Sequence, residues 1–277
     1  MPELTFVAAL FTPFGEDGRV DRDALDAHVR FLFEHRMDAV MPCGTTGEGA
    51  LLEEDEVAEV VEATVRAAEQ RTVIAHVGRP GTDATIRLGR RAVNAGATAI
   101  SAVTPYYYPL THEQALRHYR SLLEAFSDTP VFAYTIPERT GNELQRETLE
   151  ALAEEGLAGL KDSTKSFERH LEYLAATKGQ DVRVLMGSDG MVLQALRAGA
   201  AGSVSALANV RPDLLIQLKR SFLEGREDDS ERVQGEIAEL RASLSQGPAL
   251  AALKKAVSER LAGMGVRYPS ALRAPLG

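Results

Sequence analysis

Cysteine is nearly absent from this sequence, and tryptophan is entirely absent. The single cysteine, Cys43, cannot form a disulfide within the chain, which fits a reducing compartment. No apolar run approaches the roughly 20 residues needed to cross a bilayer. Residues 1–7 show no basic stretch followed by an apolar one, as an export signal would. We therefore expect a cytoplasmic protein with no membrane partner.

Basic clusters are missing as well. The chain carries a formal net charge of −9, and its lysines and arginines form no patch of the kind that binds phosphate backbones. We therefore expect no nucleic-acid partner. The six histidines are scattered, without the paired spacing of metal ligands. This scatter argues against a metal site.

The chain alternates throughout between short apolar runs and longer amphipathic ones. The eight expected strands are 4–10, 39–42, 72–77, 99–104, 131–134, 157–161, 182–186 and 202–206. Strands that alternate with helices indicate a parallel sheet with right-handed crossovers. Eight such units in 277 residues predict an α/β fold, a closed (β/α)8 TIM barrel. A doubly wound open sheet is the alternative.

Several expected helices carry clear end signals. Asp21 is a candidate N-cap, and Thr111 with Gln114 forms a candidate capping box. Gly96 is a plausible left-handed terminator, and Pro212 suits the first turn of a helix.

Two more helices, 228–243 and 249–263, follow the eighth unit and indicate a C-terminal helical appendage. The charged segment 223–229, with its central glycine, is the best candidate for the connecting turn. We therefore expect residues 1–225 to form a barrel catalytic domain, and residues 226–277 to pack on it as helices.

Polar motifs follow five of the expected strands, at the barrel end where active sites of this fold lie. In chain order they are Gly44-Thr45-Thr46-Gly47-Glu48, Thr104-Pro105-Tyr106-Tyr107-Tyr108-Pro109, Tyr134 with Arg139 beyond it, Lys161, and Gly187-Ser188-Asp189-Gly190. We expect these groups to converge on one pocket.

Lys161 is the centre of this group. It is one of only six lysines, and it directly follows the apolar residues 157–160. An amine in poorly solvated surroundings loses preference for its charged form, and a neutral amine can form a Schiff base with a ketone. The other five lysines are expected on solvated faces. The alternative for Lys161 is a structural ion pair with Asp162.

The neighbouring motifs each allow two interpretations. The Gly44–Gly47 segment offers hydroxyls and backbone N–H groups to a small carboxylate, or it is only a tight turn. Tyr134 is either a proton-transfer group or a core phenol. Arg139 either holds a substrate carboxylate or lies on the surface.

The two remaining motifs are less specific. Tyr106 and Tyr108 suit core or interface packing. Gly187–Gly190 has the composition of a phosphate-binding loop, which does not by itself indicate a phosphate substrate.

Together these motifs resemble the dihydrodipicolinate synthase / N-acetylneuraminate lyase family of pyruvate-dependent class I aldolases. The resemblance covers nearly the whole chain, and it rests on the order and spacing of the motifs. They are Gly44–Glu48, Thr104–Tyr107, Tyr134 with Pro137-Glu138-Arg139-Thr140-Gly141, and Gly159-Leu160-Lys161.

The resemblance implies a role for each catalytic residue. Lys161 forms the imine with pyruvate, and Tyr134 shuttles protons. Thr45 links Tyr134 to Tyr107, which in the family reaches into the site of a neighbouring subunit. A homodimer or homotetramer is therefore implied. No metal or organic cofactor is required.

The resemblance also implies the pyruvate-binding groups. Backbone N–H groups of Gly44, Thr45 and Thr46 hold the carboxylate, and the carbonyl of Val204 lies close to bound pyruvate.

The aldehyde partner is less determined. Arg139 within Pro-Glu-Arg-Thr-Gly matches the arginine that binds aspartate semialdehyde in the synthases, which favours 4-hydroxy-tetrahydrodipicolinate synthesis. Tyr106–Pro109 and Lys161-Asp162-Ser163 instead resemble the 2-keto-3-deoxygluconate aldolases of the same family, which pair pyruvate with glyceraldehyde. A non-catalytic relative that only binds keto acids is a third possibility.

Overall fold

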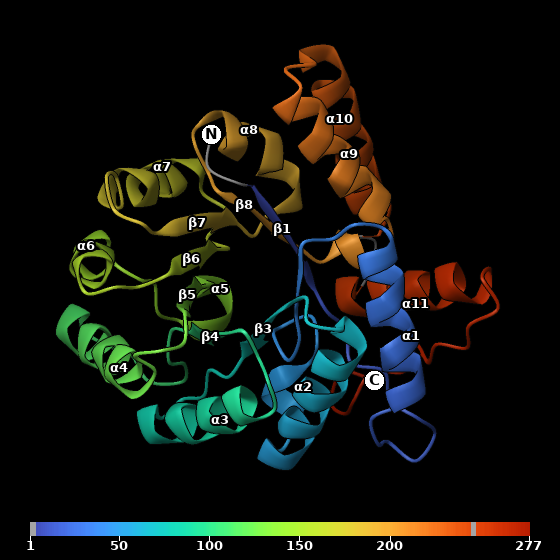
Figure 1. Ribbon diagram of the computed structural model, residues 1–277, viewed down its shortest axis with the longest axis horizontal. Helices are drawn as coiled ribbons and strands as arrows, with labels where there is room; N and C mark the ends of the chain where they lie inside the picture. The colour runs from blue at the N-terminus through green and yellow to red at the C-terminus, as the bar shows by residue number, and fades with distance from the viewer. Residues whose placement is uncertain (1–3, 245–247) are drawn as a thin grey trace.

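Eight parallel strands pair in chain order and close into a barrel, with β8 pairing with β1 (Figure 1). The computed structural model describes residues 4–244 and 248–277. The predicted α/β class and (β/α)8 barrel are confirmed, and closure of the sheet excludes the open doubly wound alternative. None of the helices in these two ranges is long and apolar enough to span a bilayer.

The strands lie where the apolar runs predict them, with ends shifted by at most two residues. Their bounds are β1 Thr5–Ala9, β2 Ala39–Met41, β3 Thr72–His76, β4 Ala99–Val103, β5 Val131–Thr135, β6 Gly159–Asp162, β7 Arg183–Met186 and β8 Gly202–Ser205. Nearly every strand residue is buried, because one face meets the barrel interior and the other meets the surrounding helices.

The helices form a ring around the strands (Figure 1). The predicted ones are α1 Arg22–Glu34, α2 Glu54–Ala68, α3 Thr82–Asn94, α4 His112–Ala125, α6 Arg146–Glu154, α7 Phe167–Ala176, α8 Val192–Arg197 and α9 Pro212–Leu223. Four short pieces were not predicted, namely α5 Pro137–Thr140, η1 Gly49–Leu51, η2 Asp189–Met191 and η3 Leu207–Asn209. All four lie in loops that follow strands.

The predicted helix-end signals are confirmed. The Asp21 side chain accepts from the N–H of Ala24 at the start of α1, and Thr111 with Gln114 forms a complete capping box on α4. Gly96 has a φ of +98° just after α3. Pro212 is the first residue of α9.

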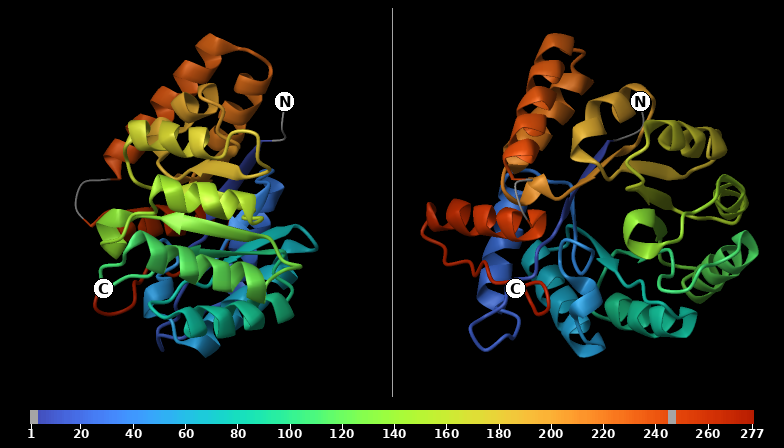
Figure 2. Two further views of the ribbon diagram at one scale, coloured as in Figure 1. Left: turned by 90° about the vertical axis from the view of Figure 1, so that its left-hand side faces the viewer. Right: turned by 180° about the vertical axis from the view of Figure 1, so that it is seen from behind.

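Two helices follow the barrel, α10 Glu227–Ser243 and α11 Ala249–Ala262. α10 lies alongside α9, and α11 lies beside α1 (Figures 1 and 2). The left view of Figure 2 shows the C-terminus at the barrel end toward which the strands point, and the start of β1 at the opposite end. The last residues of the chain therefore lie at the end where the polar motifs gather. The division of the chain at residue 225 stays a prediction.

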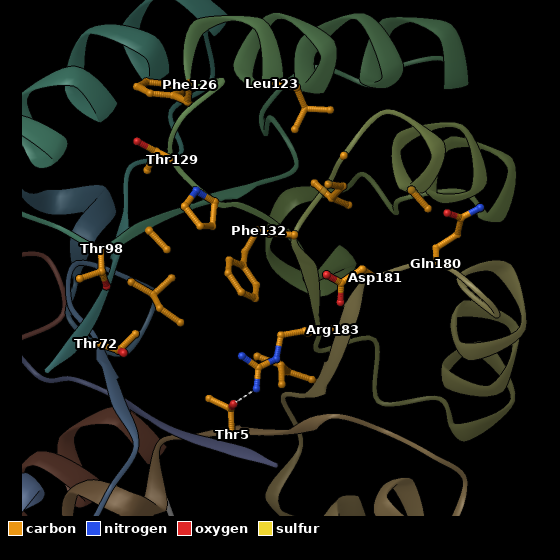
Figure 3. Close-up of a pocket in the computed structure, with 18 of the residues that line it drawn as sticks. Thr5, Thr72, Thr98, Leu123, Phe126, Thr129, Phe132, Gln180, Asp181 and Arg183 are labelled. Carbon is orange, nitrogen blue, oxygen red and sulfur yellow. Dashed lines mark hydrogen bonds between the residues drawn. The ribbon is translucent and has the colours of Figure 1, made fainter. Parts of the chain in front are cut away.

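The barrel interior is a packed core rather than a channel. Its apolar side chains are Val7, Ala9, Ala39, Met41, Ile74, Ala99, Phe132, Leu185 and Val204. A cavity of about 1150 Å³ opens at the end where the strands begin (Figure 3). There the Arg183 guanidinium donates to the Thr5 hydroxyl (Figure 3). This cavity lies at the wrong end of the strands for the predicted site.

His28 of α1 makes the stability of this fold sensitive to acid. Both of its ring nitrogens are buried without a hydrogen-bond partner among the described residues, and its ring packs edge-on against Tyr268 at 5.0 Å between centroids. Burial lowers the pKa of His28 to about 4, because water no longer solvates the charged ring. The unfolded chain therefore binds a proton at a higher pH than the folded chain does.

We predict that His28→Phe reduces the loss of stability on acidification. Between pH 6.5 and 4 the unfolded histidine is protonated while the folded one stays neutral, so the free energy of unfolding falls as pH falls. The gap between 6.5 and about 4 corresponds to about 3 kcal/mol. Denaturant unfolding at pH 7.5 and pH 4 checks this. An equal loss in wild type and variant would contradict it.

Candidate active site

Lys161 and Tyr134 lie side by side inside the barrel. The register of β5 and β6 pairs Tyr134 with Lys161, so both side chains point to the same face of the sheet. The Lys161 Nζ lies 4.0 Å from the centroid of the Tyr134 ring. Lys161 is 5% exposed and Tyr134 is 2% exposed. The two residues predicted for imine and proton chemistry are therefore in contact, and they are shielded from bulk water.

Gly159 makes room beneath this pair. A Cβ added at Gly159 would lie 2.4 Å from the Phe132 ring, closer than a real Cβ comes to another heavy atom. Phe132 and Gly159 are paired in register two residues before Tyr134 and Lys161. The large ring thus fills the barrel under the lysine, and the glycine allows it to do so.

The alternative ion pair between Lys161 and Asp162 does not form. Asp162 is 1% exposed and its side chain lies outside the barrel, where Oδ2 lies 2.8 Å from His170 Nδ1 of α7. Its other oxygen accepts from the N–H and hydroxyl of Thr164 at 2.9 and 2.7 Å. Successive strand residues face opposite sides, so a neighbour in sequence is not a neighbour in space. Among the described residues, no carboxylate pairs with the Lys161 amine.

Thr45 reaches Tyr134 from the loop after β2. Its hydroxyl lies 3.2 Å from the Tyr134 hydroxyl. The loop is tightly wound, since the N–H of Gly49 donates to the Gly44 carbonyl at 3.0 Å, and a Cβ at Gly49 would lie 1.7 Å from the Cys43 carbonyl oxygen. The glycines therefore allow a turn that no residue with a side chain could make there.

The predicted pyruvate-binding residues lie in two places, the loop after β2 and the inner face of β8. Gly44 is buried and Thr46 is half-buried in the loop after β2. Val204 of β8 is 2% exposed and belongs to the same interior cluster as Leu185, which is paired in register with Lys161.

Arg139 lies on α5, the short helix after β5. It is exposed, and among the described residues no carboxylate pairs with it. The adjacent Glu138 pairs instead with Lys165, Oε2 to Nζ at 2.5 Å. Together with Thr45 and His76, Arg139 lines a cavity of about 480 Å³. Lys161 and Tyr134 are not among the lining residues, and Thr45 connects them to this cavity through its bond to Tyr134.

His76 supports the site from β3. Its Nε2 accepts from the N–H of Val103 at 3.3 Å, which leaves Nδ1 to donate to the Cys43 carbonyl at 3.1 Å. Burial lowers its pKa to about 3, with smaller contributions from the charges of Lys161 and Arg79. The ring lies edge-on to Tyr134. His76 therefore stays neutral, and it joins the loop after β2 to β4.

Asp189, after β7, is a candidate that the sequence analysis did not select. Its Oδ1 is buried without a hydrogen-bond partner among the described residues. Burial raises the pKa of its carboxyl, while nearby groups that include Ser205 and Lys161 offset part of this rise. The sequence could have indicated Asp189, because this residue lies in the Gly187–Gly190 motif directly after a strand.

Tyr107 does not complete the relay within one chain. It is 83% exposed, and its ring packs edge-on against Tyr108 at 5.0 Å between centroids. Its φ of +83° is unusual for a residue with a side chain. The link from Thr45 to Tyr107 is therefore absent inside the chain, and the expected contribution from a neighbouring subunit stays a prediction.

The expectation that the other five lysines are solvated was wrong for Lys254. Its side chain is fully buried, and its Nζ lies 2.7 Å from Glu48 Oε1. Lys254 shares the buried face of α11 with Val257 and Leu261, so helical spacing could have revealed its burial. Burial lowers the pKa of Lys254, and the Glu48 carboxylate offsets part of this effect.

In the part of the chain that the structure describes, no cluster of three or more histidine, cysteine, aspartate or glutamate side chains could hold a metal ion.

Known proteins resemble this chain in amino-acid sequence. One relative is an uncharacterized DapA-like lyase of Halobacterium salinarum, 39% identical over 92% of this chain and 83% of the relative. Another is a 4-hydroxy-tetrahydrodipicolinate synthase of Methanothrix thermoacetophila, 34% identical over 84% of this chain and 78% of the relative.

Solved structures agree with these relatives. The chloride-inhibited dihydrodipicolinate synthase of Acinetobacter baumannii, complexed with pyruvate, superposes with a TM-score of 0.88 at 29% identity, over 100% of this chain and 93% of that one. The profile of the Dihydrodipicolinate synthetase family matches residues 4–277. The chain therefore belongs to the dihydrodipicolinate synthetase family.

Proposed function

We propose that this family member is a class I lyase that condenses pyruvate with an aldehyde through an imine on Lys161. One observation carries the proposal. The buried Lys161 amine lies 4.0 Å from the centre of the Tyr134 ring, and the hydroxyl of that tyrosine is bonded to Thr45 at the mouth of the barrel. The pyruvate found in the Acinetobacter baumannii structure supports the choice of keto acid.

The proposed chemistry uses only groups of the chain. The neutral Lys161 amine attacks the ketone carbon of pyruvate, and the ketone oxygen leaves as water after Tyr134 donates a proton. The protonated imine withdraws electrons, so the methyl group loses a proton and becomes an enamine. The enamine carbon then attacks the aldehyde carbon, whose oxygen takes up a proton. Release from the lysine by hydrolysis or ring closure restores the free amine.

The experiment that tests this proposal is borohydride reduction in the presence of pyruvate. We predict a covalent adduct with the mass of one pyruvate less water plus two hydrogens, mapped to the peptide that contains Lys161. Lys161→Met should abolish the adduct. Lys178→Met removes an exposed lysine and is the matched control, which should label like wild type. A wild-type protein that forms no adduct would instead be a non-catalytic binding relative.

For the aldehyde partner we propose aspartate semialdehyde, which makes the protein a 4-hydroxy-tetrahydrodipicolinate synthase. The support is Arg139, an exposed guanidinium on the wall of the cavity next to Thr45. The neighbouring Glu138 is already paired with Lys165, so it does not compete for the arginine. A planar guanidinium holds a carboxylate bidentately.

A second candidate substrate is glyceraldehyde, as in 2-keto-3-deoxygluconate-type aldolases. The observation that favours it is the buried, unpartnered Oδ1 of Asp189, which can accept a hydrogen bond from a substrate hydroxyl. Asp189 lies close enough to Lys161 for their charges to interact. The hydroxyls of glyceraldehyde would satisfy this oxygen.

We predict that Arg139→Ala separates the two substrates. Loss of a charge-assisted bidentate bond costs about 1.5–3 kcal/mol, so KM for aspartate semialdehyde should rise about 10- to 150-fold. Glyceraldehyde lacks a carboxylate, so its KM should change little. Steady-state assays with pyruvate and each aldehyde measure both values. Equal effects on the two aldehydes would reject the assignment of Arg139.

We also propose that the protein works as a homodimer or homotetramer. Tyr107 and Tyr108, in the loop after β4, are 83% and 68% exposed, and their rings contact each other. Aromatic anchors that become buried on association are typical of protein interfaces. Tyr107 would then reach the Thr45 of a second copy. Sedimentation velocity measures the assembly, and a fully active monomer would contradict this proposal.

A further inference from the structure

A second buried lysine is attached to the loop that carries Thr45. The Lys254 Nζ lies 2.7 Å from Glu48 Oε1, and both side chains are fully buried. The other oxygen, Oε2, accepts from the N–H of Arg273 at 2.7 Å. Both oxygens of the Glu48 carboxylate are therefore held by the C-terminal segment, one by α11 and one by the chain that follows it.

Arg273 is itself anchored at several points. Its Nη2 lies 2.8 Å from Glu56 Oε1 and donates to the Gly18 carbonyl at 2.6 Å. The Phe14 ring lies 4.4 Å from Lys254 Nζ and 4.4 Å from Arg273 Cζ. The C-terminal segment thus connects the loop after β1 with the loop after β2.

Glu48 has a backbone conformation that needs contacts from other parts of the chain to stabilise it. Its φ of +56° and ψ of +28° lie in the left-handed region, which is unfavourable for a residue with a side chain and persists when surrounding contacts fix it. Its N–H donates to the Thr45 carbonyl at 3.2 Å. A displacement of Glu48 would therefore be passed directly to Thr45, three residues earlier.

The same C-terminal segment forms part of the cavity wall. Pro248, Leu250, Leu272 and Leu276 line the 480 Å³ cavity together with Thr45 and Arg139. Anchoring of the segment at Glu48 thus fixes two parts of the site together, namely the turn beside Tyr134 and the apolar wall opposite it.

We propose that Glu48, held by Lys254 and the backbone of Arg273, is the positioning residue of the Gly44–Gly47 turn. The C-terminal segment then sets the geometry of the turn that receives the pyruvate carboxylate. This inference rests on the proposed function, because it concerns how the same site is positioned.

The test is the double variant Glu48→Gln/Lys254→Met. It removes both charges together, so neither is left buried and unpaired, and the glutamine can still accept from Arg273. We expect the pyruvate concentration for half-maximal borohydride labelling of Lys161 to rise at least fivefold, because the turn is no longer held. A merely structural role would lower the amount of folded protein and its unfolding temperature, and would leave this half-saturation concentration unchanged.

Asp38→Asn/Lys219→Met is the matched control. This pair also joins a helix to the barrel, with Nζ 2.7 Å from Oδ1, but Asp38 lines the cavity at the opposite end of the barrel. Its loss should leave half-saturation by pyruvate at the wild-type value. A half-saturation of Glu48→Gln/Lys254→Met equal to that of this control would overturn the inference.

Glu56→Gln provides a second route if the double variant does not fold. It weakens the anchor of Arg273 and leaves the buried pair intact, so a smaller rise, about twofold, is expected, and no rise would overturn the inference. Different results would contradict the proposed function and the proposed role of Glu48. A wild-type protein that is not labelled by pyruvate contradicts the proposed function, whereas normal labelling with unaltered half-saturation in the variants contradicts only the role of Glu48.

Discussion

The pairing of β5 with β6 is the constraint on which the candidate site depends. It places Lys161 opposite Tyr134, and the amine then lies over the tyrosine ring. A slip of one residue would turn the lysine out of the barrel and bring Asp162 in. The outer side of β6 opposes such a slip, because Asp162 is bonded to His170 of α7 in a fully buried contact. The glycine at position 159, which Phe132 requires, opposes it from the inner side.

Two lysines of this protein are buried, and their amines have different neighbours. Lys254 faces a carboxylate at 2.7 Å, the usual way to hold a buried charge. Lys161 faces the Tyr134 ring instead, and no carboxylate of the described residues pairs with it. An ion pair holds two parts of the chain together, but its amine stays charged and bonded to the carboxylate. A ring face leaves the amine free for a ketone, which is the difference expected between an anchor and a nucleophile.

The sequence predicts the barrel well because the alternation of apolar runs and amphipathic helices reports directly on burial. It also predicts which strand ends bring polar side chains together, since Lys161, Tyr134 and Thr45 meet at one end of the barrel. Contacts that join distant parts of the chain are harder to predict. The Glu48–Lys254 pair spans 206 residues. The sequence around one of these residues does not indicate that the other is its partner. The burial of Asp189 Oδ1 depends in the same way on the packing of several loops. The place of Tyr107 is hard to predict for another reason, because its expected contact is with a second copy of the chain.

Reversible condensation of the Lys161 amine with pyruvate is the step on which the proposed function depends. The most direct measurement uses pyruvate whose ketone oxygen is isotopically labelled, in the absence of any aldehyde, with mass spectrometry following the label. Imine formation expels this oxygen as water, and hydrolysis replaces it from the solvent. We predict that the wild-type protein removes the label faster than buffer alone does, and that Lys161→Met exchanges it only at the buffer rate. Exchange by the wild type at the buffer rate, or equal exchange by both proteins, would contradict it.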